Sequence, residues 1–256
     1  GFLQTHWPVE HAVVRADLPE AVAALWRGLV DQGVATLGSA PDEGGLREIV
    51  VAMEELGRAA CPAPLLGAAL ANLALAGRSG PAAALLDRLH GGSARVGLAF
   101  ASLDPDAEAA SLVWSATTVS GTLRFVDAGP ALTQLLIVVP RDAVLALVDV
   151  TQATATRALG GPGLGEITLA DAPLQAIELD ATTLTDLRLV ARVALLARAH
   201  GAARRAFEMA VDYAKERQQF GQPIGRFQAV QHKLANNLIA LEGVRLTLQH
   251  AAEAFD

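Results

Sequence analysis

Residues 213–231 read YAKERQQFGQPIGRFQAVQ and predict two helices joined at a tight corner. Arg217 closes the first amphipathic stretch, Phe220-Gly221 and Pro223 interrupt it, and Phe227-Gln228 opens the second. The connection therefore holds a cation and an aromatic side chain between two rigid elements. A corner of this kind can bind the phosphates or the adenine of a large cofactor.

Helical spacing of apolar residues continues on both sides of this corner. We expect a long helix from Asp186 to a stop at Gly221, followed by a second helix to the end of the sequence. The two apolar stripes are Leu196, Ala203, Phe207, Ala210 and Ala214, then Phe227, Val230, Leu234, Leu238, Leu241 and Leu248. Two antiparallel helices cannot bury both stripes alone, so we expect oligomerisation or further helices. A start at Gly1 and an end at Asp256 within a helical pattern suggest a fragment of a longer protein.

The first third of the chain also has helical periodicity, and the middle third has strand periodicity. Helical faces are predicted around Leu25 and Met53, and a helix resumes at 65–75 after Pro62 and Pro64. The strand candidates, which alternate or are rich in β-branched residues, are 96–100, 112–114, 119–125, 135–139 and 145–148. Gly160–Gly163 predicts a loop rather than a phosphate cradle, because no apolar strand precedes it and no P-loop lysine follows it.

These patterns predict an α+β protein with three parts. An all-helical domain is expected at 1–92, a small β-barrel or sandwich domain at 93–183, and an incomplete helical domain at 184–256. No internal repeat of solenoid length is visible.

Composition narrows the possible partners. The net charge of −7 argues against nucleic acid, because binding to phosphates needs clustered excess Lys and Arg. Cys61 is the single cysteine and cannot form an internal disulfide, so a reducing, cytoplasmic compartment is the expectation. Residues 59–77 form the longest uncharged run of the chain. Pro62, Pro64 and Asn72 within it favour a buried helix over a membrane span. No His, Cys, Asp or Glu spacing indicates a metal site.

The order of helices, strands and long helices, with AKERQQFG at 214–221 and FQAVQHKLA at 227–235, resembles the acyl-CoA dehydrogenase family. MEELGR at 53–58 is similar to the family's N-terminal helix pair, and VSGTLRFV at 119–126 to its barrel hairpin. The resemblance implies an acyl-CoA dehydrogenase-like fold whose C-terminal bundle is truncated here.

The same resemblance implies the chemistry. In this family a glutamate removes the α-proton of an acyl-CoA thioester, and the β-hydrogen leaves as hydride to FAD. FAD lies across two subunits, and the neighbour's helix corner contacts its adenosine and pyrophosphate. By resemblance, Arg217, Phe220 and Gln228 bind FAD in this way. From the residues alone, Arg217 is a solvated cation at a helix C-terminus and Phe220 is a core anchor.

The sequence departs from the family pattern where the flavin ring would lie. The usual Thr-Glu-Pro and Gly-Ser-Asp residues correspond to 100–108, where only Asp104-Pro105 is similar. The usual Trp-Ile-Thr corresponds to Phe125-Val126-Asp127, and an aspartate beside a ring that accepts hydride is electrostatically unfavourable. We therefore expect a weakened flavin site in this chain's own β domain.

The catalytic base is also missing from its expected place. One family position for it corresponds to Ala191, beside Arg192, and the other falls beyond Asp256. Three helical carboxylates remain, and we expect solvated or intersubunit ion pairs for them: Glu208, Glu216 and Glu242. His200 could carry a proton and His232 could contact the cofactor, but single helical histidines are more often packed or exposed.

Three functions stay open. The chain is a subunit of an FAD-dependent acyl-CoA dehydrogenase that passes electrons to an electron-transfer flavoprotein; or it is a flavin-free subunit that lends Arg217, Phe220 and Gln228 to a same-family partner; or it is an acyl-CoA-binding scaffold. The second resembles actinobacterial heterotetramers that degrade steroid side chains. The helix within 59–77 and the Trp26 region are expected to shape the acyl pocket, where small alanines leave room for a bulky acyl group.

Overall fold

The computed structural model describes residues 1–100, 112–139, 143–155 and 163–256. Six helices open the chain and confirm its helical first third. They are α1 (Phe2–His6), α2 (Val9–Ala16), α3 (Pro19–Val30), α4 (Leu46–Arg58), α5 (Leu65–Leu75) and α6 (Pro81–His90), with 3₁₀ turns at Val34–Thr36 and Pro41–Glu43. Leu25 and Met53 are buried, as the helical spacing predicts, and α5 occupies the predicted range.

Strands occupy the middle third. They are β1 (Val96–Phe100), β2 (Val113–Trp114), β3 (Thr118–Val126), β4 (Gln134–Val139), β5 (Val144–Asp149), β6 (Ala153–Ala155) and β7 (Gly165–Glu178), with a 3₁₀ turn at Gly129–Ala131. They form one seven-stranded sheet in the order β1-β4-β5-β7-β3-β2, and β6 pairs with β7. Only the β1–β4 pair among these is parallel.

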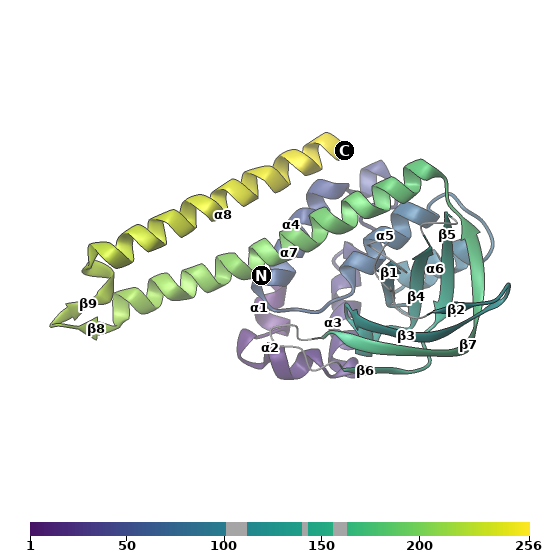
Figure 1. Ribbon diagram of the computed structural model, residues 1–256, viewed down its shortest axis with the longest axis horizontal. Coiled ribbons are helices and arrows are strands. Elements are labelled where there is room, and N and C mark those ends of the chain that lie inside the picture. Colours follow the sequence, from purple (N-terminus) through teal and green to yellow (C-terminus); the bar gives the residue numbers. More distant parts are fainter. Residues whose placement is uncertain (101–111, 140–142, 156–162) are drawn as a thin grey trace.

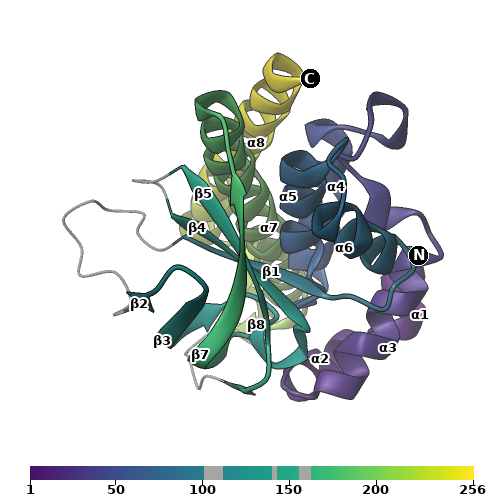
Figure 2. The ribbon, with the colours of Figure 1, turned by 90° about the vertical axis from the view of Figure 1, so that its right-hand side faces the viewer.

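The sheet separates two apolar cores. Leu135 and Ile137 of β4 pack with Val119 and Leu123 of β3, so the two halves of the sheet enclose a core between them, as in a barrel. The alternate residues of β4, such as Leu136, join the larger helical core. Figure 2 shows α5 and α6 on one side of β1, β4 and β5, which explains why both faces of β4 are apolar.

Two long helices complete the chain. α7 (Ala181–Glu216) crosses the body, and a two-residue ribbon of β8 (Gln218–Gln219) and β9 (Gln222–Pro223) leads through a 3₁₀ turn (Ile224–Arg226) to α8 (Gln228–Phe255). Figure 1 shows that these helices project from the body as a hairpin, with the ribbon at its far end. We call residues 217–228 the hairpin corner. The boundaries at 92/93 and 183/184 stay predictions; α6 ends at His90 and α7 begins at Ala181.

The hairpin differs from the sequence prediction in two respects. α7 ends at Glu216 instead of Gly221, because Phe220 and Gly221 form the turn of the ribbon. The predicted apolar stripe of α7 does not face the body: Leu196 is 57% exposed, and the buried face contains Leu187, Ala194 and Ala197 instead. The stripe of α8 is covered only in part, with Leu248 buried and Leu238 39% exposed.

Candidate cofactor corner and the junction behind it

The hairpin corner presents its functional candidates to solvent. Phe220 is 91% exposed, and Arg217 and Gln228 are exposed as well. Within the described part of the chain, the guanidinium of Arg217 takes part in none of the ion pairs or side-chain hydrogen bonds. Arg217 is thus the solvated cation that the residues alone indicate, whereas Phe220 is not a core anchor.

The corner is nevertheless rigid. The Ile224 N–H donates to the Arg217 carbonyl at 2.8 Å, and the Gln231 side-chain amide donates to the Gly225 carbonyl at 2.9 Å. Phe220 (φ 53°) and Gly221 (φ 77°) are both left-handed, which is the geometry of a type I′ turn between two strands. A bulky residue rarely adopts such a φ value, so the backbone of Phe220 takes part in the turn at a conformational cost.

The ring of Phe220 has one aromatic neighbour in the corner. Phe227 lies edge-on to it, with ring centroids 6.0 Å apart and an interplanar angle of 88°. One face of an almost fully exposed aromatic ring is therefore left for a planar ligand. The exposed guanidinium, amide and ring fit the adenosine-diphosphate part of a dinucleotide, which needs donors for phosphate and a surface for stacking.

A second polar cluster connects α7 with the end of β3 and with the segment that follows α4. Arg198 of α7 donates from Nη1 to Asp127 Oδ1 at 2.6 Å and from Nη2 to the carbonyl oxygen of Cys61 at 3.0 Å. The side chains of Arg198 and Asp127 are each 20% exposed. The charge of Asp127 raises the pKa of Arg198 against the opposing effect of burial. Asp127 is therefore neutralised by a cation within the chain, which corrects the expectation of a free negative charge at this position.

The other flavin-motif residues at 101–108 lie outside the described residues, as does most of the glycine loop at 160–163. Cys61 itself is fully buried, and burial raises the pKa of its thiol to about 12. Its thiol is therefore protonated at neutral pH and is not a nucleophile.

Two of the three carboxylates considered as a base are held in ion pairs, and the third is exposed to solvent. Glu208 and Glu242 form ion pairs with arginines of the same chain, and these pairs are about one third exposed, in agreement with the expectation of solvated pairs. Glu216 is exposed on α7. Hydrogen bonds from Arg58 to Glu208 and from Arg245 to Glu242 are the largest causes that lower the pKa values of these two carboxyls.

The positions of the remaining candidates follow from their packing. Ala191 is buried, and His200 is packed between helices with hydrogen bonds to Glu54 and to the Leu241 carbonyl. His232 is exposed on α8. Ala191 has no ionisable group, and Glu208 and Glu242 are held in ion pairs, so no base is assigned among the described residues.

A large cavity opens where α4, α5, α7 and α8 meet. Its volume is about 790 Å³, and one side is formed by small and apolar residues: Ala69, Leu73, Ala76, Val190 and Phe255. The lining also includes the charged residues Asp42, Glu43 and Arg47. Trp26, expected near an acyl pocket, is fully buried in the core and donates from Nε1 to the Ala94 carbonyl at 3.2 Å.

Comparison with known proteins identifies the family. The profile described as acyl-CoA dehydrogenase, C-terminal domain, matches residues 181–256. Acyl-CoA dehydrogenase IpdE2 of Mycobacterium tuberculosis is 32% identical over 90% of this chain and 65% of its own length. IpdE2 of Mycolicibacterium smegmatis is 31% identical over 89% of this chain and 68% of its own length.

The chain belongs to the acyl-CoA dehydrogenase family. A solved relative, a variant of the Tcur3481–Tcur3483 steroid ACAD, is 29% identical and superposes with a TM-score of 0.81 over 99% of this chain and 74% of that one. This confirms the acyl-CoA dehydrogenase fold. The chain spans about two thirds of the length of the IpdE2 relatives.

The described residues contain neither a candidate membrane span nor a candidate metal cluster. None of their helices combines the length and the hydropathy needed to cross a membrane. None of their His, Cys, Asp and Glu side chains cluster in threes at distances suited to a metal ion.

Proposed function

We propose that this chain is a subunit of an FAD-dependent acyl-CoA dehydrogenase assembly that introduces an α,β double bond into an acyl-CoA thioester. In this proposal the hairpin corner enters the FAD site of a same-family partner. When bound, FAD would accept the hydride from the β-carbon of the substrate. The observation that carries the proposal is the position of Arg217 and Phe220, exposed on a rigid corner at the end of a hairpin and remote from the chain's own sheet (Figure 1).

In this proposal each of the three side chains of the corner contacts a different part of FAD. The Arg217 guanidinium can donate two parallel hydrogen bonds to pyrophosphate oxygens, and the Gln228 amide can bond to the sugar or the base. The Phe220 ring can stack on the adenine, because its turn geometry holds it away from the helices. The cofactor fits this corner on the chemistry of its exposed donors.

A supporting role without its own flavin follows from the missing base. Ala191 replaces a carboxylate, and Glu208 and Glu242 are committed to arginines. The partner in this version is a fuller member of the same family that supplies the flavin wall and the base. The solved relative above carries two component names, Tcur3481 and Tcur3483, which is compatible with unequal subunits.

One observation favours the alternative, a subunit that holds its own flavin. Arg198 neutralises Asp127, so the aspartate does not bring an uncompensated negative charge to this part of the β domain. The electrostatic objection to a flavin here is therefore smaller than the sequence suggests. Transfer of electrons onward to an electron-transfer flavoprotein belongs to this alternative.

Flavin stoichiometry tests both versions. The full protein is purified alone and together with any family member that is encoded beside it, and released flavin is counted per chain from its visible absorption. About half a flavin per chain in the mixed complex and none alone supports the supporting role. One flavin per chain alone supports the self-sufficient version; no flavin in either preparation contradicts both and leaves the scaffold.

The arginine of the corner is tested in the same preparation. Arg217→Met should lower the flavin content of the complex at least tenfold, since a bidentate contact to pyrophosphate is lost. Lys233→Met, which removes an exposed cation of α8 outside the corner, is the matched control and should leave the flavin content unchanged. Equal flavin in both variants would refute the role of Arg217.

The cavity of about 790 Å³ is the proposed place of the acyl group. Its small residues on α5 leave room for a bulky acyl chain, and its volume lies in the range of ligand sites. Turnover of the complex with a polycyclic acyl-CoA but not with butyryl-CoA is expected. Turnover only with short straight-chain thioesters would refute this choice of substrate.

A further inference from the structure

The outer part of the α7–α8 hairpin has almost no buried contact with the other described residues. Between residues 202 and 216 of α7 only Ala214 is buried, and on α8 only Leu248 and Ala252 are buried. Ala214 faces Gly225, so it stabilises the hairpin internally and does not attach it to the body. The direction in which the hairpin projects must therefore be set near its base.

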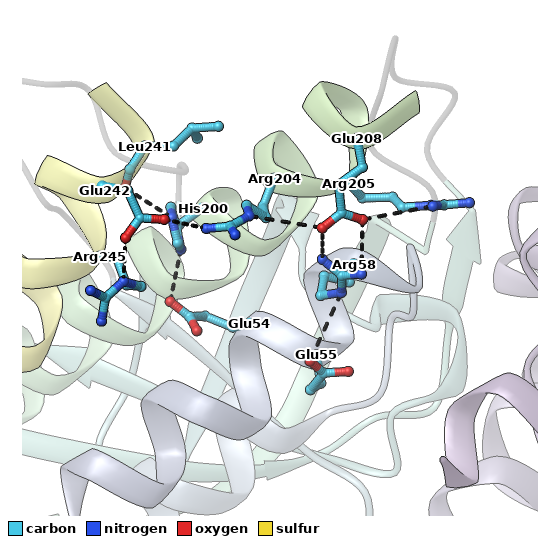
Figure 3. Close-up of polar contacts among 10 residues, drawn as sticks. All are labelled: Glu54, Glu55, Arg58, His200, Arg204, Arg205, Glu208, Leu241, Glu242 and Arg245. Carbon is cyan, nitrogen blue, oxygen red and sulfur yellow. Dashed lines mark hydrogen bonds and ion pairs between the residues drawn. The ribbon is translucent and has the colours of Figure 1, made fainter. Parts of the chain in front are cut away.

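A chain of ion pairs crosses that base from α4 to α8 (Figure 3). Arg58 of α4 binds Glu208 of α7 with two bonds, Nη1 to Oε1 at 2.7 Å and Nη2 to Oε2 at 3.0 Å. Arg204, one turn earlier on α7, lies 3.8 Å from Glu208 and donates to Glu242 of α8 at 2.5 Å. Arg245 donates to the other oxygen of Glu242 at 2.8 Å.

A buried histidine reinforces the same junction. The side chain of His200 is 4% exposed, and its two ring nitrogens face acceptors on two different helices. Nδ1 lies 2.7 Å from Glu54 Oε1 on α4, and Nε2 lies 3.1 Å from the Leu241 carbonyl on α8. His200 and the ion-pair chain thus tie the same three helices at adjacent turns.

From this geometry we infer that Glu208 and Glu242 are positioning residues for the hairpin corner. Glu208 fixes α7 to α4 through the Arg58 fork, and Glu242 fixes α8 to α7 through Arg204. This inference rests on the proposed function, because it assigns the two carboxylates a part in placing Arg217 in the partner's FAD site.

The length of α8 between the ion pairs and the hairpin corner explains how weak ion pairs can affect the position of the corner. Fourteen residues separate Glu242 from Gln228, which is about 21 Å of helix, so a tilt of about 10° at the base moves the corner by roughly 4 Å. The pairs are about one third exposed, and screening by solvent keeps the contribution of such pairs to folding small. A shift of about 1 Å can already impair a site that depends on exact placement. Loss of the pairs should therefore change the position of the corner far more than the stability of the fold.

The test compares Glu208→Gln with Glu216→Gln. Both changes remove one carboxylate from α7, but Glu216 is exposed and takes part in none of the ion pairs of the described residues. Spin labels are attached to cysteines introduced at Gln219 in the ribbon and at Arg88 on the outside of α6. The native Cys61 is fully buried and does not compete for the label. Double electron–electron resonance then gives the distribution of distances between the label at position 219 in the corner and the label at position 88 in the body.

We expect Glu208→Gln to broaden this distribution in the isolated chain and to lower the flavin content of the partner complex at least twofold. Glu216→Gln should change neither quantity, and Glu242→Gln should act like Glu208→Gln. An unchanged distance distribution overturns the inference, and so does a broadened distribution with full flavin content. The Arg217→Met variant separates the two proposals: if it keeps its flavin, the proposed function fails, while the distances still decide whether Glu208 sets the hairpin.

Discussion

The guanidinium of Arg198 and the carboxylate of Asp127 lie 2.6 Å apart at the junction of the helical and β parts of the chain. The second guanidinium nitrogen of Arg198 binds the Cys61 carbonyl, so one side chain joins α7, the end of β3 and the segment after α4. Seventy-one residues separate the pair in sequence. The aspartate that departs from the family pattern is thus part of a structural contact in this chain.

Arg198→Met should destabilise the fold by about 2–3 kcal/mol, because it leaves the carboxylate of Asp127 largely buried without a partner. Urea denaturation followed by circular dichroism measures this change. Arg124→Met is the control. The side chains of Arg124 and of its partner Glu166 are 71% and 38% exposed, so this pair should contribute less than about 1 kcal/mol to the stability of the fold. Equal midpoints for the two variants would contradict the importance of the buried pair.

Phe220→Gly should separate stability from cofactor binding. Glycine adopts the left-handed φ of this position without strain, so the chain should unfold at the same or a slightly higher urea concentration. The flavin content of the partner complex should fall, because the exposed ring is lost. Gly221→Ala is the converse change: it keeps the ring but should cost about 1 kcal/mol at φ 77°. A Phe220→Gly complex with full flavin would show that the ring does not bind the cofactor.

Gly201→Ala should loosen the crossing of α4 and α7. A Cβ atom at Gly201 would lie 2.0 Å from the backbone oxygen of Glu54, so the two helices would have to move apart. We expect a loss of about 1–3 kcal/mol in the free energy of unfolding. Gly243→Ala on α8 meets no atom within 4 Å and should instead stabilise the chain by up to about 1 kcal/mol, through helix propensity. Equal effects of the two substitutions would contradict the close approach.

Asp256→Asn should reduce the pH dependence of stability. Burial opposes ionisation of Asp256, but bonds from the Leu46 and Arg47 N–H groups and the Arg47 guanidinium outweigh burial and lower its pKa. A lowered pKa in the folded state stabilises the fold above the unfolded-state pKa of about 4, and this stabilisation is lost as the pH falls through the folded value.

The stability difference between the wild-type chain and Asp256→Asn should therefore be constant between pH 5 and pH 7 and shrink below about pH 4. Urea midpoints at pH 6, 4 and 3 measure it. A difference that stays constant down to pH 3 would show that the carboxylate charge does not stabilise the start of α4.

Local patterns predicted much of the secondary structure. The buried faces around Leu25 and Met53, the helix at 65–75 and the strands at 96–100 and 134–139 follow directly from apolar spacing. The strand β7 was not specified, because Asp171 and Pro173 interrupt its alternation and Asp171 adopts a left-handed φ. α1 and α2 were not predicted either, since their short stretches mix charged and apolar residues without a clear stripe.

The sequence proposes residue types for the candidate site but does not show its geometry. The sequence identified Arg217, Phe220 and Gln228, and the exposure of all three agrees with an intersubunit role that stays a proposal. It could not show that Glu208 binds Arg58, because 150 residues separate them. It also gave no sign that Arg198 compensates Asp127, since a charge pattern along one helix does not identify partners on another element.

By itself the sequence determined most of the helices and several strands, and it identified the hairpin corner, because periodicity and turn residues act over a few positions. The partners of Asp127, Glu208 and His200 were decided only by the tertiary structure. Packing of α4 against α7 through Gly57 and Gly201 brings their backbones into contact, and this close approach places distant charges within bonding distance. Long-range pairs depend on that packing, and so their identity follows from the assembled fold and not from local preference.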